Sequence, residues 1–280
     1  MKKQFVQYSG IVFATFFAFG NFIACGAKMY KVSLEDDTTP PRNATNLTNG
    51  EGGSYSEPFP GIHAPLGWAT LPIPYKFSKS LEEDQKVGLL KAMKTWERAV
   101  GKQLFEFHGE DPQKGDHFKD LYSSLDDSTN GHYQDNNWDK TGKSDLVLAT
   151  TIWDTVSGEP YQVSTADIRF NAQYYVIGDS YTAVSDGTRE VVDMESLALH
   201  ELGHLLGLSH ISEEDDPLSI MNPSLYIGEG LTSRKISKGD IDRIQRIYGC
   251  EGGACDVEET FALLEKGDFE DAEEAVLEAH

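Results

Sequence analysis

The chain has 280 residues, of which 39% are hydrophobic and 25% are charged, and this composition is that of a globular protein. Its formal net charge of −22 argues against binding to nucleic acid, because a polyanion would be repelled by an acidic surface. Three cysteines are too few for a disulfide-built scaffold or for a zinc site made of four thiolates.

The first 24 residues have the pattern of an export signal. Lys2 and Lys3 give a positive start, and residues 11–24 are mostly apolar. A helix of about 14 residues spans only about 21 Å, which is short for a bilayer. We therefore expect residues 1–24 to be a signal peptide, and an uncleaved membrane anchor is the alternative.

Cys25 ends this apolar segment and resembles the lipidated cysteine of a bacterial lipobox, although Phe22 replaces the usual aliphatic residue. An acylated Cys25 would anchor the protein to a membrane. This predicts an exported lipoprotein in the periplasm or at the cell surface, and an incidental cysteine is the alternative. Residues 25–60 are rich in Thr, Pro, Asn, Gly and Ser, so we expect a flexible tether.

The folded part begins with alternating apolar residues at 73–77, which predict a strand. Residues 80–83 have the pattern of a capping box, and the helix that follows should end near Gly101. A second strand is expected at 104–107. Residues 109–143 are polar and are expected to form a long loop.

Further strands are expected at 146–153 and 166–170, followed by a loop-rich stretch to about residue 187. Because strands come first and the decisive helices come late, the order indicates an α+β fold. The long polar loop offers oxygen ligands for calcium, although acidic loops are more often only solvated. The candidate ligands are Asp126, Asp127, Asp135 and Asp139.

A metal-binding pattern follows on a helix that should begin after Asp193, a good N-cap residue. His200 and His204 lie four residues apart, so both imidazoles leave the same face of the helix. Two neutral imidazoles in this arrangement suit a tetrahedral zinc ion. Glu201 lies beside them and can reach a water on the metal without being a ligand itself.

Gly207 is predicted to end this helix in a sharp turn. A glycine can adopt the left-handed conformation, and this would bring His210 back toward the other two histidines. His210 is therefore expected to be the third metal ligand, with the fourth position open to water.

The pattern from His200 to His210 resembles the extended zinc motif of the metzincin metallopeptidases, in which a methionine turn follows. Met221 lies in such a turn, and the closing helix should begin after Ser237. The similarity is best to matrixin-like bacterial enzymes and covers roughly residues 65–249. It implies the zincin/metzincin fold, a twisted mixed β-sheet with an active-site helix and a C-terminal helix, for a catalytic domain at 61–249.

The resemblance also implies an activity. Zinc would activate a water, Glu201 would act as general base, and the substrate would be a protein or peptide cleaved within its chain. Residues 222–235 would line the primary side-chain pocket, and we expect a monomer. The alternative is a zinc-containing surface lipoprotein that binds a partner without turnover.

The chain ends in an acidic segment at 250–280. Cys250 and Cys255 are expected to form a disulfide outside the cytoplasm, and two free thiols are the alternative. The apolar residues of this tail predict short amphipathic helices, which either pack on the catalytic domain, remain disordered or bind a partner.

Overall fold

The computed structural model describes residues 30–33, 67–112, 129–156 and 159–266. The predictions for the signal peptide, for Cys25, for most of the tether and for the last residues of the tail lie outside the described residues. Within the described part of the chain, no helix combines the length and the apolar character that crossing a bilayer requires.

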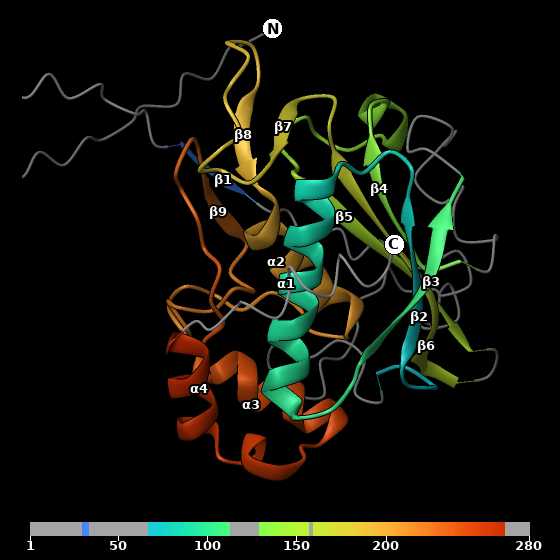
Figure 1. Ribbon diagram of the computed structural model, residues 1–280, viewed down its shortest axis with the longest axis vertical. Helices are drawn as coiled ribbons and strands as arrows, with labels where there is room; N and C mark the ends of the chain where they lie inside the picture. The colour runs from blue at the N-terminus through green and yellow to red at the C-terminus, as the bar shows by residue number, and fades with distance from the viewer. Residues whose placement is uncertain (1–29, 34–66, 113–128, 157–158, 267–280) are drawn as a thin grey trace, which may run out of the picture.

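A five-stranded sheet forms one layer of the fold (Figure 1). Its strands lie in the order β3-β2-β4-β6-β5, and all neighbours are parallel except β5, which pairs antiparallel with β6. The predicted mixed sheet of an α+β fold is therefore confirmed. The strands are β2 Ile73–Ser78, β3 Phe105–Asp111, β4 Gly131–Asp135, β5 Ala149–Val156 and β6 Glu159–Asn171.

Helix α1, Glu83–Val100, packs against helix α2, Met194–Leu205, beside this sheet (Figure 1). The apolar spacing predicted for α1 is confirmed, because its core-facing side chains are fully or almost fully buried. Trp96 joins the two helices, since its indole Nε1 donates to the Leu199 carbonyl over 3.0 Å. The helix that carries the histidines is thus held against a rigid partner.

The start of α1 corrects the predicted capping box. The N-cap is Glu82, two residues after Ser80, and Gln85 accepts the backbone N–H of Glu82 over 2.8 Å. The Ser80 hydroxyl is used elsewhere, because it contacts Ser78 Oγ and accepts the Gln134 N–H. The contacts of Ser80 with β2 and β4 therefore replace the helix cap that the local sequence pattern predicts.

The long loop expected at 109–143 is also corrected. Strand β3 continues to Asp111, and the segment contains β4 and the 3-10 helix η3, Trp138–Thr141. The polar residues of β4 gave no strand pattern in the sequence. Asp135 is nevertheless buried, because it forms an ion pair with Arg169. The strand expected at 146–153 begins and ends three residues later, at Ala149–Val156.

Two small sheets lie outside the main one. Strand β1, Tyr30–Ser33, pairs antiparallel with β9, Ser224–Ile227, although a flexible tether was expected there. Backbone pairing to a strand distant in sequence needs no alternating side chains, so the pattern did not reveal it. Strands β7, Tyr175–Gly178, and β8, Glu190–Asp193, pair in parallel in the stretch expected to be loop-rich.

The C-terminal part contains helix α3, Lys238–Tyr248, whose predicted cap is confirmed because Ser237 accepts the Asp240 N–H. Beyond it lie the 3-10 helix η4, Gly252–Cys255, and helix α4, Val257–Lys266. Phe261 and Leu264 of α4 pack against the hydrophobic core. The described part of the acidic tail is therefore folded onto the domain.

His132 of β4 is a buried polar group in this core. It is 1% exposed, its Nδ1 lies 3.3 Å from the Lys76 carbonyl oxygen, and Tyr75 and Phe77 approach its ring edge-on. Burial lowers the pKa of His132 from 6.5 to about 4. Between pH 6.5 and about 4, the His132 ring is therefore neutral in the folded state, whereas in the unfolded chain it binds a proton.

We predict that this histidine makes the protein less stable in mild acid. Between pH 6.5 and about 4 the unfolded chain binds the extra proton, so the free energy of unfolding falls as the pH falls, by roughly 3 kcal/mol at most. His132→Phe should flatten this part of the profile, as measured by denaturant unfolding from pH 8 to pH 4. An equally steep acid loss in the variant would contradict the assignment.

Candidate metal centre

Helix α2 carries the candidate site and is fixed at its first turn. As predicted, Asp193 is the N-cap, and its carboxylate accepts the Ser196 N–H over 3.0 Å. Arg234 holds the same carboxylate through two nitrogens, at 2.9 and 2.5 Å. All residues of α2 are buried, so the helix cannot shift without disturbing the core.

Three imidazoles converge at the other end of α2. The Nε2 atoms of His200 and His204 lie 3.0 Å apart, and His210 Nε2 lies 3.1 and 3.3 Å from them. Two nitrogens bound tetrahedrally to one zinc ion at about 2.0–2.1 Å would lie about 3.3 Å apart. Among the described residues this is the one group of three metal-ligating side chains, and its geometry fits a zinc site.

The other ring nitrogens set the tautomers. His200 Nδ1 lies 2.7 Å from the Ile220 carbonyl oxygen, and His204 Nδ1 lies 2.8 Å from the Leu208 carbonyl oxygen. A carbonyl only accepts, so each Nδ1 carries a proton, and in a neutral ring the lone pair is then on Nε2. Lone pairs facing one another over 3.0 Å repel unless a cation lies between them, which is the second argument for a metal.

The turn after α2 brings the third histidine into place. Gly207 has a φ of 103°, a backbone conformation that residues other than glycine rarely adopt. This positive φ agrees with the glycine turn that the sequence predicts. The Gly207 N–H donates to the His204 carbonyl and the Leu208 N–H to the Gly203 carbonyl, each over 2.9 Å. The chain therefore reverses within a few residues, and His210 returns to the other imidazoles.

Met221 lies directly against α2 beneath the histidines. It is completely buried, and a Cβ atom added at Gly203 would lie 2.3 Å from its sulfur. Gly203 is one of the two unspecified positions between the paired histidines, and here only a glycine lets the methionine approach. The Ile211 N–H also donates to the Met221 carbonyl over 3.1 Å, which ties the turn to the segment after His210.

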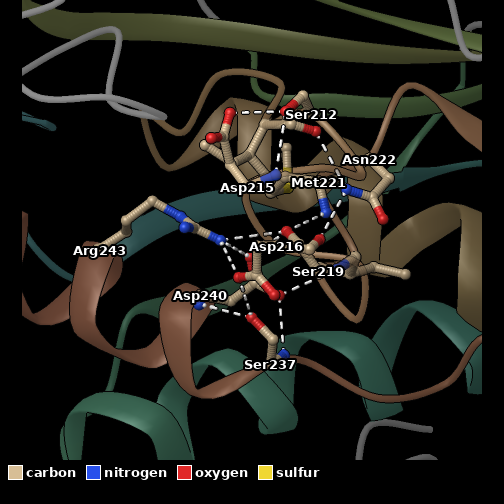
Figure 2. Close-up of polar contacts among 11 residues, drawn as sticks. Ser212, Asp215, Asp216, Ser219, Met221, Asn222, Ser237, Asp240 and Arg243 are labelled. Atoms are coloured by element: carbon tan, nitrogen blue, oxygen red, sulfur yellow. Dashed lines mark hydrogen bonds and ion pairs between the residues drawn. The ribbon is translucent and has the colours of Figure 1, made fainter.

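A polar network fixes this turn to α3 (Figure 2). Asp240 accepts the Ile220 N–H over 2.9 Å and the Ser219 hydroxyl over 2.6 Å. Arg243 approaches Asp240 at 2.6 Å and Asp216 at 3.0 Å, so the buried carboxylate is neutralised. Since the Ile220 carbonyl in turn accepts from His200, the first turn of α3 positions the His200 ring through one residue.

Glu201 is 3% exposed and points toward the sheet. Its Oε2 accepts the hydroxyl of Thr151 in strand β5 over 2.7 Å, and the same hydroxyl lies 3.0 Å from the Glu201 carbonyl oxygen. The carboxylate is thereby held in one orientation. Sequence analysis missed Thr151, because no local pattern marks a contact between residues 50 positions apart.

A cavity of about 570 Å³ lies beside the methionine turn. Its walls include Ile220, Asn222 and Leu225, together with residues of α4. Glu195 and Arg234 contribute charge, and burial raises the pKa of Glu195 to about 7 although Arg234 opposes the shift. This is large enough for a sizeable side chain of a ligand.

The remaining candidate residues lie apart from this centre. Cys250 and Cys255 form a disulfide in the segment that follows α3. Of the proposed calcium ligands, Asp126 and Asp127 lie outside the described residues, and Asp135 is occupied by Arg169. Asp139 accepts from Tyr174 and Gln173, and these hydrogen bonds lower its pKa. The two described aspartates therefore give the calcium prediction no support.

A helix with paired histidines, a third histidine after a glycine turn and a buried methionine below them define a metzincin type of site. Comparison with known families agrees: the model for the family described as matrixin matches residues 68–249, and the chain belongs to this family. The predicted resemblance is confirmed.

Similar proteins come from plants and mammals. The chain is 42% identical over 119 residues to Metalloendoproteinase 2-MMP of Arabidopsis thaliana, which covers 38% of this chain and 30% of that protein. It is 32% identical over 120 residues to Metalloendoproteinase 5-MMP of the same plant, covering 38% and 32%. It is 43% identical over 65 residues to Matrilysin of Felis catus, covering 23% of each chain. The chain thus matches about a third or less of each relative.

Gly203→Ala tests the contact beneath the histidines. The new methyl group would overlap the Met221 sulfur, so we expect a loss of roughly 1–3 kcal/mol in unfolding free energy and weaker zinc binding. Gly253→Ala is the matched control, because nothing lies within 4 Å of its added Cβ. Denaturant unfolding and a zinc titration measure both effects, and equal behaviour of the two variants would contradict the close contact.

Asp240→Asn tests the network of Figure 2. The variant removes the buried charge that faces Arg243, so we expect a loss of about 3–5 kcal/mol in stability together with reduced zinc affinity. Asp242→Asn is the control on the same helix, since Asp242 forms only a half-exposed pair with Arg246. Unchanged zinc affinity in a folded Asp240→Asn protein would show that the network does not position His200.

Proposed function

We propose that the chain is a zinc-dependent endopeptidase in which His200, His204 and His210 hold the metal and Glu201 is the general base. The observation that carries the proposal is the convergence of three imidazole nitrogens beside a buried carboxylate oriented by Thr151. The relatives named metalloendoproteinase and matrilysin support the same class of activity. The chain spans about a third or less of the length of each of these relatives.

Zinc bound by the three histidines would lower the pKa of a water molecule and polarise the scissile carbonyl. The chain's own residues then handle the protons. Glu201, which follows the first histidine in α2, would accept the proton of the attacking water and return it to the leaving amine. Thr151 keeps the carboxylate in place by donating to Oε2 and does not itself exchange a proton with the substrate.

The substrate we propose is a protein or peptide bound in an extended conformation. Strand β5, which carries Thr151, lies at the edge of the main sheet in the order of the described strands. An extended peptide can pair with such an edge. The cavity beyond the methionine turn is lined by residues between Asn222 and Lys235, where the sequence predicts the primary side-chain pocket.

We further propose an exported lipoprotein, anchored through Cys25 and facing the periplasm or the cell surface. The Cys250–Cys255 disulfide supports an oxidising compartment. All four groups of the centre come from one chain, which supports a monomer as the working unit. Calcium is not part of the proposal.

The test compares the purified full-length protein with two variants. Glu201→Ala should keep one zinc ion but lose cleavage of a peptide library by about 10²–10⁴-fold or more. Thr151→Val should also keep zinc, with a smaller loss in kcat, because the base remains but its orientation is free. Hydrolysis by Glu201→Ala at the parent rate would overturn the assigned base, and an inactive parent with zinc bound would favour a binding module.

A further inference from the structure

Helix α4 lies outside the part of the chain that matches the family, yet it is firmly attached to the domain. The disulfide between Cys250 and Cys255 closes the segment before it. Gln245 of α3 donates to the Ala254 carbonyl over 2.6 Å, and Phe261 packs against the core. The Lys238 ammonium lies 5.3 Å from the centre of the Phe261 ring. These contacts make α4 a fixed wall rather than a loose extension.

This wall closes one side of the cavity beyond the methionine turn. Leu264 and Glu265 line the cavity from α4, and Leu225 and Tyr226 line it from strand β9. Lys235 also lines the cavity and pairs with Glu265 over 3.0 Å. The C-terminal segment thus contributes one apolar side chain and the acidic partner of one ion pair to the cavity wall.

The cavity and the metal centre share one residue, Ile220. Ile220 lines the cavity, and its carbonyl oxygen lies 2.7 Å from His200 Nδ1. Asn222, on the other side of Met221, also lines it and donates to the Ile211 carbonyl over 3.0 Å. The cavity is therefore separated from His200 by a single residue, close to where a peptide held at the three histidines would lie.

We propose that α4 is a specificity element of the proposed peptidase, in which Leu264 and Glu265 form the far wall of the cavity that receives a large apolar substrate side chain. The inference rests on the proposed function. The role of α4 goes beyond the proposed function, because this helix follows the part of the chain that matches the family. The apolar side chains of Ile220, Leu225 and Leu264 suit an aromatic or long aliphatic group, while Lys235 and Glu265 neutralise each other in the cavity wall.

Two substitutions on α4 separate this role from simple packing. Leu264→Trp fills the cavity from its far wall, so the kcat/KM ratio for peptides with Phe over those with Ala at the variable position should fall on the order of tenfold. Leu263→Trp is the matched control, because Leu263 is the adjacent residue of α4, is 59% exposed and does not line the cavity. Its ratio should stay at the parent value.

Glu265→Lys tests the charge at the end of the cavity. It places a second cation beside Lys235, so peptides with an acidic side chain at the variable position should gain several-fold in kcat/KM relative to those with Phe. Glu259→Lys makes the same change of charge on an exposed part of α4 that does not line the cavity. Ratios that are identical in both charge variants would overturn the role of Glu265.

The same series is measured without turnover by calorimetry on zinc-loaded Glu201→Ala protein carrying each α4 substitution. If the parent cleaves peptides but neither its cleavage ratios nor these affinities respond to Leu264→Trp and Glu265→Lys, the inference about α4 is wrong and the proposed function stands. If the parent cleaves nothing, the proposed peptidase fails. The affinities then still decide whether α4 selects the bound side chain, since an unselective or absent affinity overturns the inference.

Discussion

The hydrogen bonds from the ring Nδ1 atoms of His200 and His204 to two backbone carbonyls are the constraint on which the site depends. They force the Nε2 lone pairs to face one another at 3.0 Å, an arrangement that is unfavourable without a cation. The fold has to hold the carbonyls of Ile220 and Leu208 against this repulsion. The surrounding turns and helices hold these two carbonyl groups in place.

Each carbonyl is supported differently. The Leu208 carbonyl is placed by the turn at Gly207, which is continuous with α2 and needs only local backbone hydrogen bonds. The Ile220 carbonyl belongs to a distant segment, so it is fixed by Asp240 at the start of α3 and by Met221 packed against Gly203. A buried carboxylate is tolerated there because Arg243 and three hydrogen-bond donors satisfy it.

The sequence predicts the parts of this arrangement that follow local rules. The four-residue spacing in α2, the turn at Gly207 and the cap at Ser237 were all recognisable because they depend on neighbouring residues. Thr151, by contrast, meets Glu201 only through the pairing of the whole sheet with α2. Strand β4 escaped notice because its buried Asp135 is neutralised by an arginine in another strand. Contacts between distant segments leave no periodic pattern in the chain.

The most direct test of the central claim is zinc K-edge X-ray absorption on the full-length protein and its His210→Ala variant. In the parent we expect three imidazole nitrogens at about 2.0–2.1 Å and one oxygen ligand. In the variant we expect two imidazoles and a weaker affinity. Fewer than three imidazoles in the parent, or the same coordination in both proteins, would contradict the convergence of His200, His204 and His210 on one metal ion.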